Sequence, residues 1–90
     1  MIEYRSTQPE SGSIPDTRDL IEFFNQHKDK YTYGLLYNII NGNRNERTLK
    51  ITELILFFKG DPTKKAQRRR MLAALRWACN VQKREMKPRD

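Results

Sequence analysis

Residues 61–87, with the sequence DPTKKAQRRRMLAALRWACNVQKREMK, have the pattern of one long helix, and we expect this helix to organise the rest of the chain. Asp61 suits the N-cap of a helix, and Pro62 suits the first helical position because its missing N–H would have no partner there. Pro88 follows the helical pattern. We therefore expect residues 88–90 to form a frayed tail.

The two sides of this helix differ in character. On a helical wheel of about 100° per residue, one side is apolar and is expected to face the core. That side holds Met71, Leu72, Leu75, Ala78 and Cys79. The other side holds the cations Lys65, Arg68, Arg69, Arg76 and Lys83, with Lys64 at its margin. Arg70 and Trp77 lie between the two sides, and we predict that Trp77 is in the core because tryptophan is highly buried on average.

A shorter amphipathic helix is predicted near the start of the chain. Asp16 or Thr17 can cap it, because a short side-chain oxygen accepts hydrogen bonds from the free N–H groups of the first turn. Its apolar face lies within residues 20–24, and polar residues follow, so we expect it to end near residues 28–30.

A second short helix is predicted to begin after a cap at Thr32. Tyr33 and Tyr37 recur at helical spacing with its other apolar residues, so we predict that both rings pack in the core. Tyr31 precedes this pattern, which leaves it as the tyrosine expected to be free to stack on an unpaired base. Gly42 is expected to end the helix in the left-handed conformation that is common after helix C-termini.

Residues 45–58 fit two kinds of secondary structure. Ile51, Leu54 and Ile55 have helical spacing, whereas the β-branched Thr48 and Thr52 would also suit a short strand. We favour a helix because a single strand would have no strand to pair with. Gly60 should end this helix, and the short connection to Asp61 favours a helical hairpin or a sharp corner.

These elements predict an all-α fold, a compact bundle of about four helices with a flexible N-terminal arm. We expect the arm to cover residues 1–15, where proline, glycine and serine are frequent, and a single helical domain to cover residues 16–87. The chain has 90 residues, so its core is small. A homodimer, which would add apolar burial, remains an alternative to a monomer.

The charge of the chain is concentrated in its second half. Residues 1–45 carry five Lys or Arg and six Asp or Glu, a net charge of −1, whereas residues 46–90 carry thirteen and five, a net charge of +8. Such asymmetry indicates an anionic partner, although charge that serves only solubility is the alternative interpretation. No apolar run approaches the ~20 residues of a membrane span.

The position of the cations supports an anionic ligand. The N-terminus of a helix carries about +0.5 of a charge, so cations are electrostatically disfavoured there and phosphates are favoured. The candidate nucleic-acid-binding residues are Lys64, Lys65, Arg68, Arg69, Arg70, Arg76 and Lys83. Three further cations would extend this surface if the third and fourth helices form a hairpin: Arg44, Arg47 and Lys50. If the helices do not form a hairpin, these three are ordinary solvated residues.

We find no constellation that indicates catalysis, a metal site or a cofactor site. His27 and Cys79 are the only histidine and the only cysteine, and they do not have metal-ligand spacing. The four glycines are isolated, so no phosphate-binding loop is present. A lone cysteine in an apolar pattern and the absence of a secretory signal favour an intracellular location, cytoplasmic or nuclear.

One segment has a local resemblance to a known family. Residues 36–56, LYNIINGNRNERTLKITELIL, resemble the recognition helix and the following helix of Cro/repressor-type helix-turn-helix proteins. The shared features are Ile39 or Ile40, Gly42, Arg44, Asn45, Thr48 and Leu49. Glu46 stands where that family usually has proline, and too few residues precede the segment for the positioning helix of the family. We therefore do not identify the chain as a member.

The sequence predicts a small, basic, non-enzymatic accessory or regulatory protein that binds RNA or DNA through its Lys- and Arg-rich helix. The alternative is a protein–protein interaction module, an inhibitor or adaptor of the kind found among viral or phage accessory proteins, that binds an acidic surface of its partner. Exposed apolar residues beside the cations, such as Trp77 or Phe57, would favour this alternative.

Overall fold

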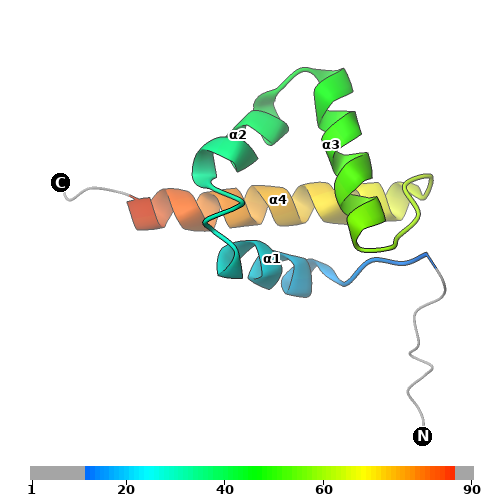
Figure 1. Ribbon diagram of the computed structural model, residues 1–90, viewed down its shortest axis with the longest axis horizontal. Helices are drawn as coiled ribbons and strands as arrows, with labels where there is room; N and C mark the ends of the chain where they lie inside the picture. The colour runs from blue at the N-terminus through cyan, green and yellow to red at the C-terminus, as the bar shows by residue number, and fades with distance from the viewer. Residues whose placement is uncertain (1–11, 87–90) are drawn as a thin grey trace, which may run out of the picture.

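The computed structural model describes residues 12–86 and contains four α-helices in that range (Figure 1). Their bounds are α1 Thr17–Gln26, α2 Tyr33–Asn41, α3 Arg44–Phe57 and α4 Lys65–Met86. The described residues include no strand, which confirms the all-α class and the helical interpretation of residues 45–58. None of these helices is long and apolar enough to cross a membrane.

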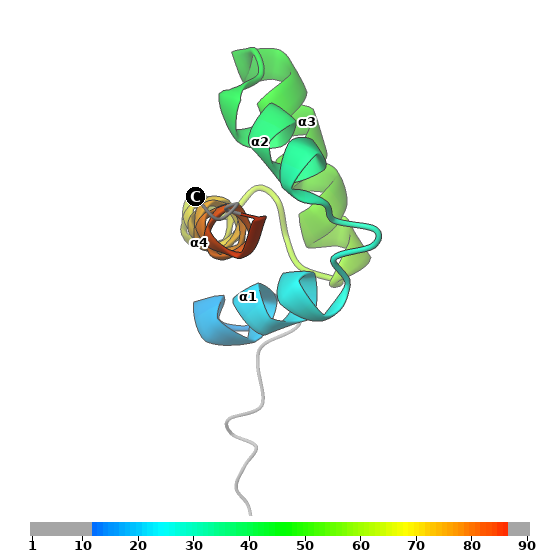
Figure 2. The same ribbon diagram turned by 90° about the vertical axis from the view of Figure 1, so that its left-hand side faces the viewer.

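The long helix α4 is the central element of the bundle. The three other helices all pack against it, and α2 also packs against α3. Figure 2, in which α4 is seen end-on, shows α1 on one side of α4 and the α2–α3 pair on another, while part of the circumference of α4 is not covered by any helix. The side chains that meet in the centre are fully buried; the largest are Leu20, Phe24, Leu36, Ile55, Met71 and Leu75.

Each of the first three helices is preceded by a capping residue whose side chain accepts a hydrogen bond from a free backbone N–H of the first turn. The side chain of Asp16 accepts a hydrogen bond from the backbone N–H of Asp19 at 2.9 Å, and that of Thr32 accepts one from Leu35 at 3.2 Å. The sequence predicted the cap at Thr32 and gave Asp16 as one of two candidate caps for α1, the other being Thr17. At the start of α3, Asn43 accepts from the backbone N–H of Glu46 at 2.9 Å in the same way.

The predicted start of α4 is wrong by three residues. The carboxylate of Asp61 accepts hydrogen bonds from the backbone N–H of Thr63 at 3.0 Å and from its hydroxyl at 2.6 Å, so it closes a turn instead of capping the helix. These hydrogen bonds lower the pKa of the Asp61 carboxyl below its usual value. Pro62 lies within this turn, and α4 begins only at Lys65.

The glycine after α2 does not have the predicted left-handed conformation. Gly42 has φ −74° and ψ 179°, which is extended backbone open to other residues. Its role is to leave space, because a Cβ at this position would lie 2.7 Å from the carbonyl oxygen of Asn38.

The left-handed residue at a helix end is instead Lys59, with φ 64°. The backbone N–H of Lys59 donates to Leu56 O at 2.9 Å and that of Gly60 to Ile55 O at 2.8 Å, the two hydrogen bonds of a Schellman motif that ends α3. A Cβ on Gly60 would lie 2.3 Å from Cγ2 of Ile14. Glycine is therefore required one residue after the left-handed position.

Residues 12–15 belong to the packed structure, which corrects the part of the predicted arm that the structure describes. Ile14 is 4% exposed and is part of the core, and the guanidinium of Arg70 donates to the carbonyl oxygens of Ile14 and Pro15 at 2.8 and 3.2 Å. The remainder of the predicted arm, residues 1–11, and the predicted tail, residues 88–90, lie outside the described residues.

Three predictions for aromatic side chains are wrong. Trp77 is 55% exposed, so it lies outside the core. Tyr31 is buried against Phe23 and Phe24, at ring-centroid distances of 5.8 and 5.0 Å, and is not free to stack on a base. Tyr37 is 49% exposed, whereas Tyr33 is half-buried.

Candidate polyanion-binding surface

One side of α4, beside the α2–α3 pair, carries a row of exposed cations. We define the cationic row as Lys65, Arg69, Arg76 and Lys83, all of which are exposed. With a rise of about 1.5 Å per residue, the row extends along roughly 27 Å of the helix. Arg69, Arg76 and Lys83 follow one another at intervals of seven residues, close to two full turns, so they lie on one line along the helix surface.

Nothing acidic interrupts the cationic row. The one carboxylate within α4 is Glu85, and it forms an ion pair with Lys28 at the C-terminal end of the bundle. Within residues 12–86, no member of the row takes part in an ion pair. The neighbouring helix α2 has the sequence YGLLYNIIN and carries no charged side chain. The positive potential of the row is therefore not cancelled locally.

Two arginines predicted to bind the ligand are engaged elsewhere. The guanidinium of Arg70 is hydrogen-bonded to the carbonyl oxygens of residues 14 and 15. Arg70 also lies on a different side of α4 from the cationic row. Arg68 donates to the carbonyl oxygen of Pro62 at 2.9 Å, and it lines a shallow hollow between α4 and α3 together with Lys65 and Arg69 of the row. The other predicted residue of this region, Lys64, is exposed in the turn that precedes α4.

The structure does not bring the three cations of α3 next to the cationic row. Arg44, Arg47 and Lys50 lie in the first half of α3, and Figure 1 shows that this end of α3 points away from α4. Arg47 donates to the carbonyl oxygen of Ile40 at 3.4 Å, at the end of α2, and Lys50 lies 3.6 Å from the carboxylate of Glu53. Helices α3 and α4 meet at a sharp corner and not in a hairpin, and the α3 residues that line a hollow with Lys65 and Arg69 of the row are Thr48 and Ile51.

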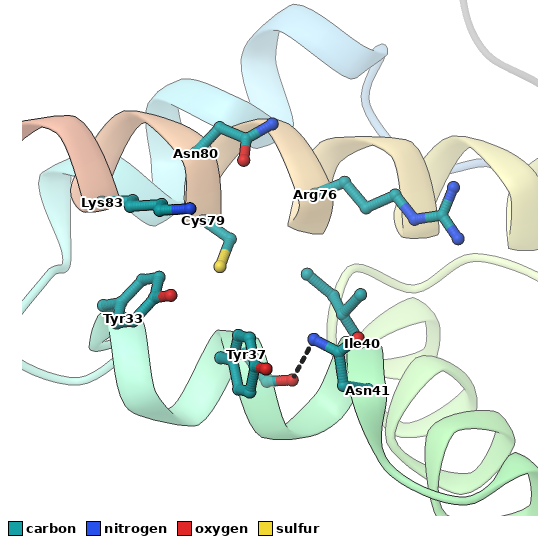
Figure 3. A pocket seen from close by; sticks show the side chains of 8 residues that line it. All are labelled: Tyr33, Tyr37, Ile40, Asn41, Arg76, Cys79, Asn80 and Lys83. Atoms are coloured by element: carbon teal, nitrogen blue, oxygen red, sulfur yellow. Dashed lines mark hydrogen bonds between the residues drawn. The ribbon is translucent and has the colours of Figure 1, made fainter.

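A groove between α2 and α4 opens beside the cationic row and has a volume of about 330 Å³ (Figure 3). Its lining residues are Tyr33, Tyr37, Ile40 and Asn41 from α2 and Arg76, Cys79, Asn80 and Lys83 from α4. The rings of Tyr33 and Tyr37 are 5.8 Å apart between centroids. The thiol of Cys79 points from α4 toward α2, and burial raises its pKa, so it is protonated at neutral pH.

The sequence pattern placed both tyrosines of this groove in the core, which is why the groove was not predicted. Helix α2 has nine residues, and its buried side is centred on Leu36 and Ile39. A helix this short has too little contact surface to bury all of its apolar side chains, so Tyr37 is left at the edge of the contact with α4. The helical wheel contained a signal for the exposure of Tyr37. Around the helix axis, Tyr37 is separated from Ile39 by a larger angle than Leu36 is.

A second exposed surface is apolar and lies on the α2–α3 pair. Leu49, Leu56 and Phe57 are all more than half exposed on α3. Leu49 and Phe57 border two hollows of about 390 and 260 Å³, which share the lining residues Leu35 and Ile39 of α2. Large apolar side chains exposed together in this way are typical of a contact surface.

Comparisons with known protein families, with curated proteins and with solved structures find no match to this chain. Among residues 12–86, no three histidine, cysteine, aspartate or glutamate side chains lie close enough together to hold a metal ion. The candidate site is thus defined by its geometry and charge alone.

Proposed function

We propose that this protein is a non-enzymatic nucleic-acid-binding protein that contacts phosphates through the cationic row of α4. The observation that carries the proposal is the uninterrupted line of exposed cations along this helix, with no carboxylate beside it. Phosphates that contact Lys and Arg release condensed counterions, which favours binding without reading the base sequence. All four side chains of the row are exposed and border the hollows between α4 and the α2–α3 pair, so a phosphate backbone can reach them from solvent.

A salt titration of a charge-neutralised variant tests this proposal. We expect the double variant Arg69→Gln/Arg76→Gln to bind a generic DNA duplex more weakly than the parent protein. Its slope of log K against log salt should be shallower by roughly 0.9 for each phosphate that is no longer neutralised, and so by about 1.8 for both. Fluorescence anisotropy with a labelled duplex at several salt concentrations gives the slope.

The matched control is Arg44→Gln/Lys50→Gln, which removes the same charge from α3. We expect it to keep nearly the full slope, because these residues lie away from the cationic row. Equal reductions in the two double variants would mean that only net charge matters, and would contradict a site on α4. An unchanged affinity in Arg69→Gln/Arg76→Gln would contradict nucleic-acid binding by the row.

A second candidate function is a protein–protein interaction module, which the exposure of Trp77 and Phe57 supports. Trp77 is next to Arg76 in the chain, and exposed tryptophan and arginine are the residue types that contribute most to protein interfaces. A nuclease-treated pull-down separates the two candidates. A partner that stays bound after nuclease treatment and is lost with Trp77→Ser would favour the interaction module, whereas release by nuclease would favour nucleic-acid binding.

A further inference from the structure

The groove between α2 and α4 adjoins the cationic row and shares two residues with it. Arg76 and Lys83 belong to the row and also line the groove, while Tyr33 and Tyr37 line its α2 side (Figure 3). We propose that this groove receives an unpaired base, which stacks on Tyr37 while Arg76 and Lys83 hold the adjoining phosphates. The ligand class would then be single-stranded nucleic acid, an inference that rests on the proposed function.

The tyrosine pair has the exposure that stacking requires. Tyr37 keeps about half of its surface open, and Tyr33, one turn earlier on α2, is half-buried. The two rings are tilted by 39° to one another at a centroid distance of 5.8 Å, so a flat ligand would not fit between them and would instead lie on the open part of Tyr37. Proteins that bind single strands combine such aromatic surfaces with a positively charged groove.

The polar groups of the groove suit a nucleotide. None of the residues that line it is acidic, so nothing in the lining repels a phosphate. The amides of Asn41 and Asn80 also line it and can hydrogen-bond to the edge of a base. Asn41 already donates one hydrogen bond to Tyr37 O at 3.1 Å, which ties its amide to the helix that carries the ring.

The same geometry disfavours a duplex in the groove. A paired base is stacked between its neighbours and cannot enter a space bordered by two helices unless it is first unpaired and unstacked. A duplex would therefore reach the cationic row only from outside and would miss Tyr37. The structure thus predicts tighter binding to a single strand than to a duplex at equal salt.

Anisotropy measurements with labelled oligothymidylate and with a duplex of equal length test this inference. The variant Tyr37→Leu keeps an apolar side chain and removes the ring. We expect its affinity for the single strand to fall about tenfold or more, as stacking on one aromatic ring predicts. Its affinity for the duplex should stay unchanged, and Tyr37→Phe should keep the affinity for both ligands.

The control variant is Trp77→Leu, which removes an exposed aromatic ring of α4 that does not line the groove, and we expect it to bind oligothymidylate as the parent does. The inference is overturned if Tyr37→Leu binds the single strand as tightly as the parent, or if it weakens both ligands equally. It is also overturned if the weaker binding occurs in Trp77→Leu instead. In each of these cases, the proposed function would still hold if duplex binding depends on Arg69 and Arg76. Failure of the base-stacking inference can therefore be distinguished from failure of the proposed function.

Discussion

Arg69 and Arg70 are adjacent in the chain and have different roles in the structure. Arg69 is exposed in the cationic row, whereas Arg70 fastens residues 14 and 15 to α4 through two hydrogen bonds. Nearby, the buried Gln67 connects two segments, because it donates to Gly12 O at 2.6 Å and accepts from the backbone N–H of Asp61 at 2.9 Å. One turn of α4 therefore contains residues that hold the chain together and a residue available to a ligand.

Replacing each arginine by methionine separates these roles. We expect Arg70→Met to lower the free energy of unfolding by about 1–3 kcal/mol, because two carbonyl groups would be left without their charged donor. Arg69→Met should change it by no more than about 0.5 kcal/mol, as is usual for an exposed residue. Urea denaturation followed by circular dichroism measures both values. Equal effects in the two variants would contradict the structural role of Arg70.

At the scale of the element, the end of α3 has its left-handed position occupied by lysine. A residue with a Cβ is strained in this conformation by roughly 1–2 kcal/mol relative to glycine. Glycine stands one residue later, at Gly60, because the close approach of Ile14 leaves no room for a side chain. Position 59 therefore requires a left-handed backbone conformation, whereas position 60 requires a residue without a side chain.

This arrangement predicts opposite effects of two substitutions. Lys59→Gly should raise the free energy of unfolding, by about 1 kcal/mol, since it removes the strain of the left-handed residue at the cost of some unfolded-state entropy. Gly60→Ala should lower the thermal midpoint, because the added Cβ would overlap Ile14 and Gln67. Thermal denaturation of both variants checks the pair. A destabilised Lys59→Gly variant would mean that the lysine side chain makes a contribution larger than the strain.

The elements could be predicted from the sequence better than their ends. Apolar residues at helical spacing identified all four helices, and Asp16 and Thr32 marked two of their starts. The start of α4 was missed because Asp61 and Pro62 suit a turn as well as a helix cap, and only the three-dimensional contacts decide between them. Gly60 was predicted to end α3, and its N–H does take part in the motif that ends the helix, but the left-handed residue of that motif is Lys59.

At the scale of the whole molecule, the basic character of α4 could be predicted from the sequence. Which of its cations hold the fold together and which are exposed could not. Arg70 and Gln82 bind backbone carbonyls far away in the sequence, at Ile14 and Tyr31, and no local pattern indicates such hydrogen bonds. The groove beside Tyr37 depends on how much of α2 is covered by α4. Exposure of this kind follows from the packing of several elements together, which a helical wheel of one element does not contain.

The packing of residues 12–15 predicts that these residues contribute to the stability of the domain. A chain that starts at residue 16 lacks Ile14 and the three carbonyl groups that Arg70 and Gln67 bind. We expect it to be less stable, by at least about 2 kcal/mol, than a chain that starts at residue 12, because it buries less apolar surface and forms fewer hydrogen bonds. Chemical denaturation of the two truncated chains measures the difference. Equal stability would place the boundary after Pro15, as the sequence pattern suggested.

The central position of α4 also has a consequence for synthesis on the ribosome. The helix on which α1, α2 and α3 all pack is the last of the four to be translated. Until it emerges, the earlier helices lack the surface that covers Leu20, Phe24 and Leu36, so the nascent chain exposes apolar residues that chaperones bind. Folding of this protein should therefore follow translation of α4 as one late event and not proceed helix by helix.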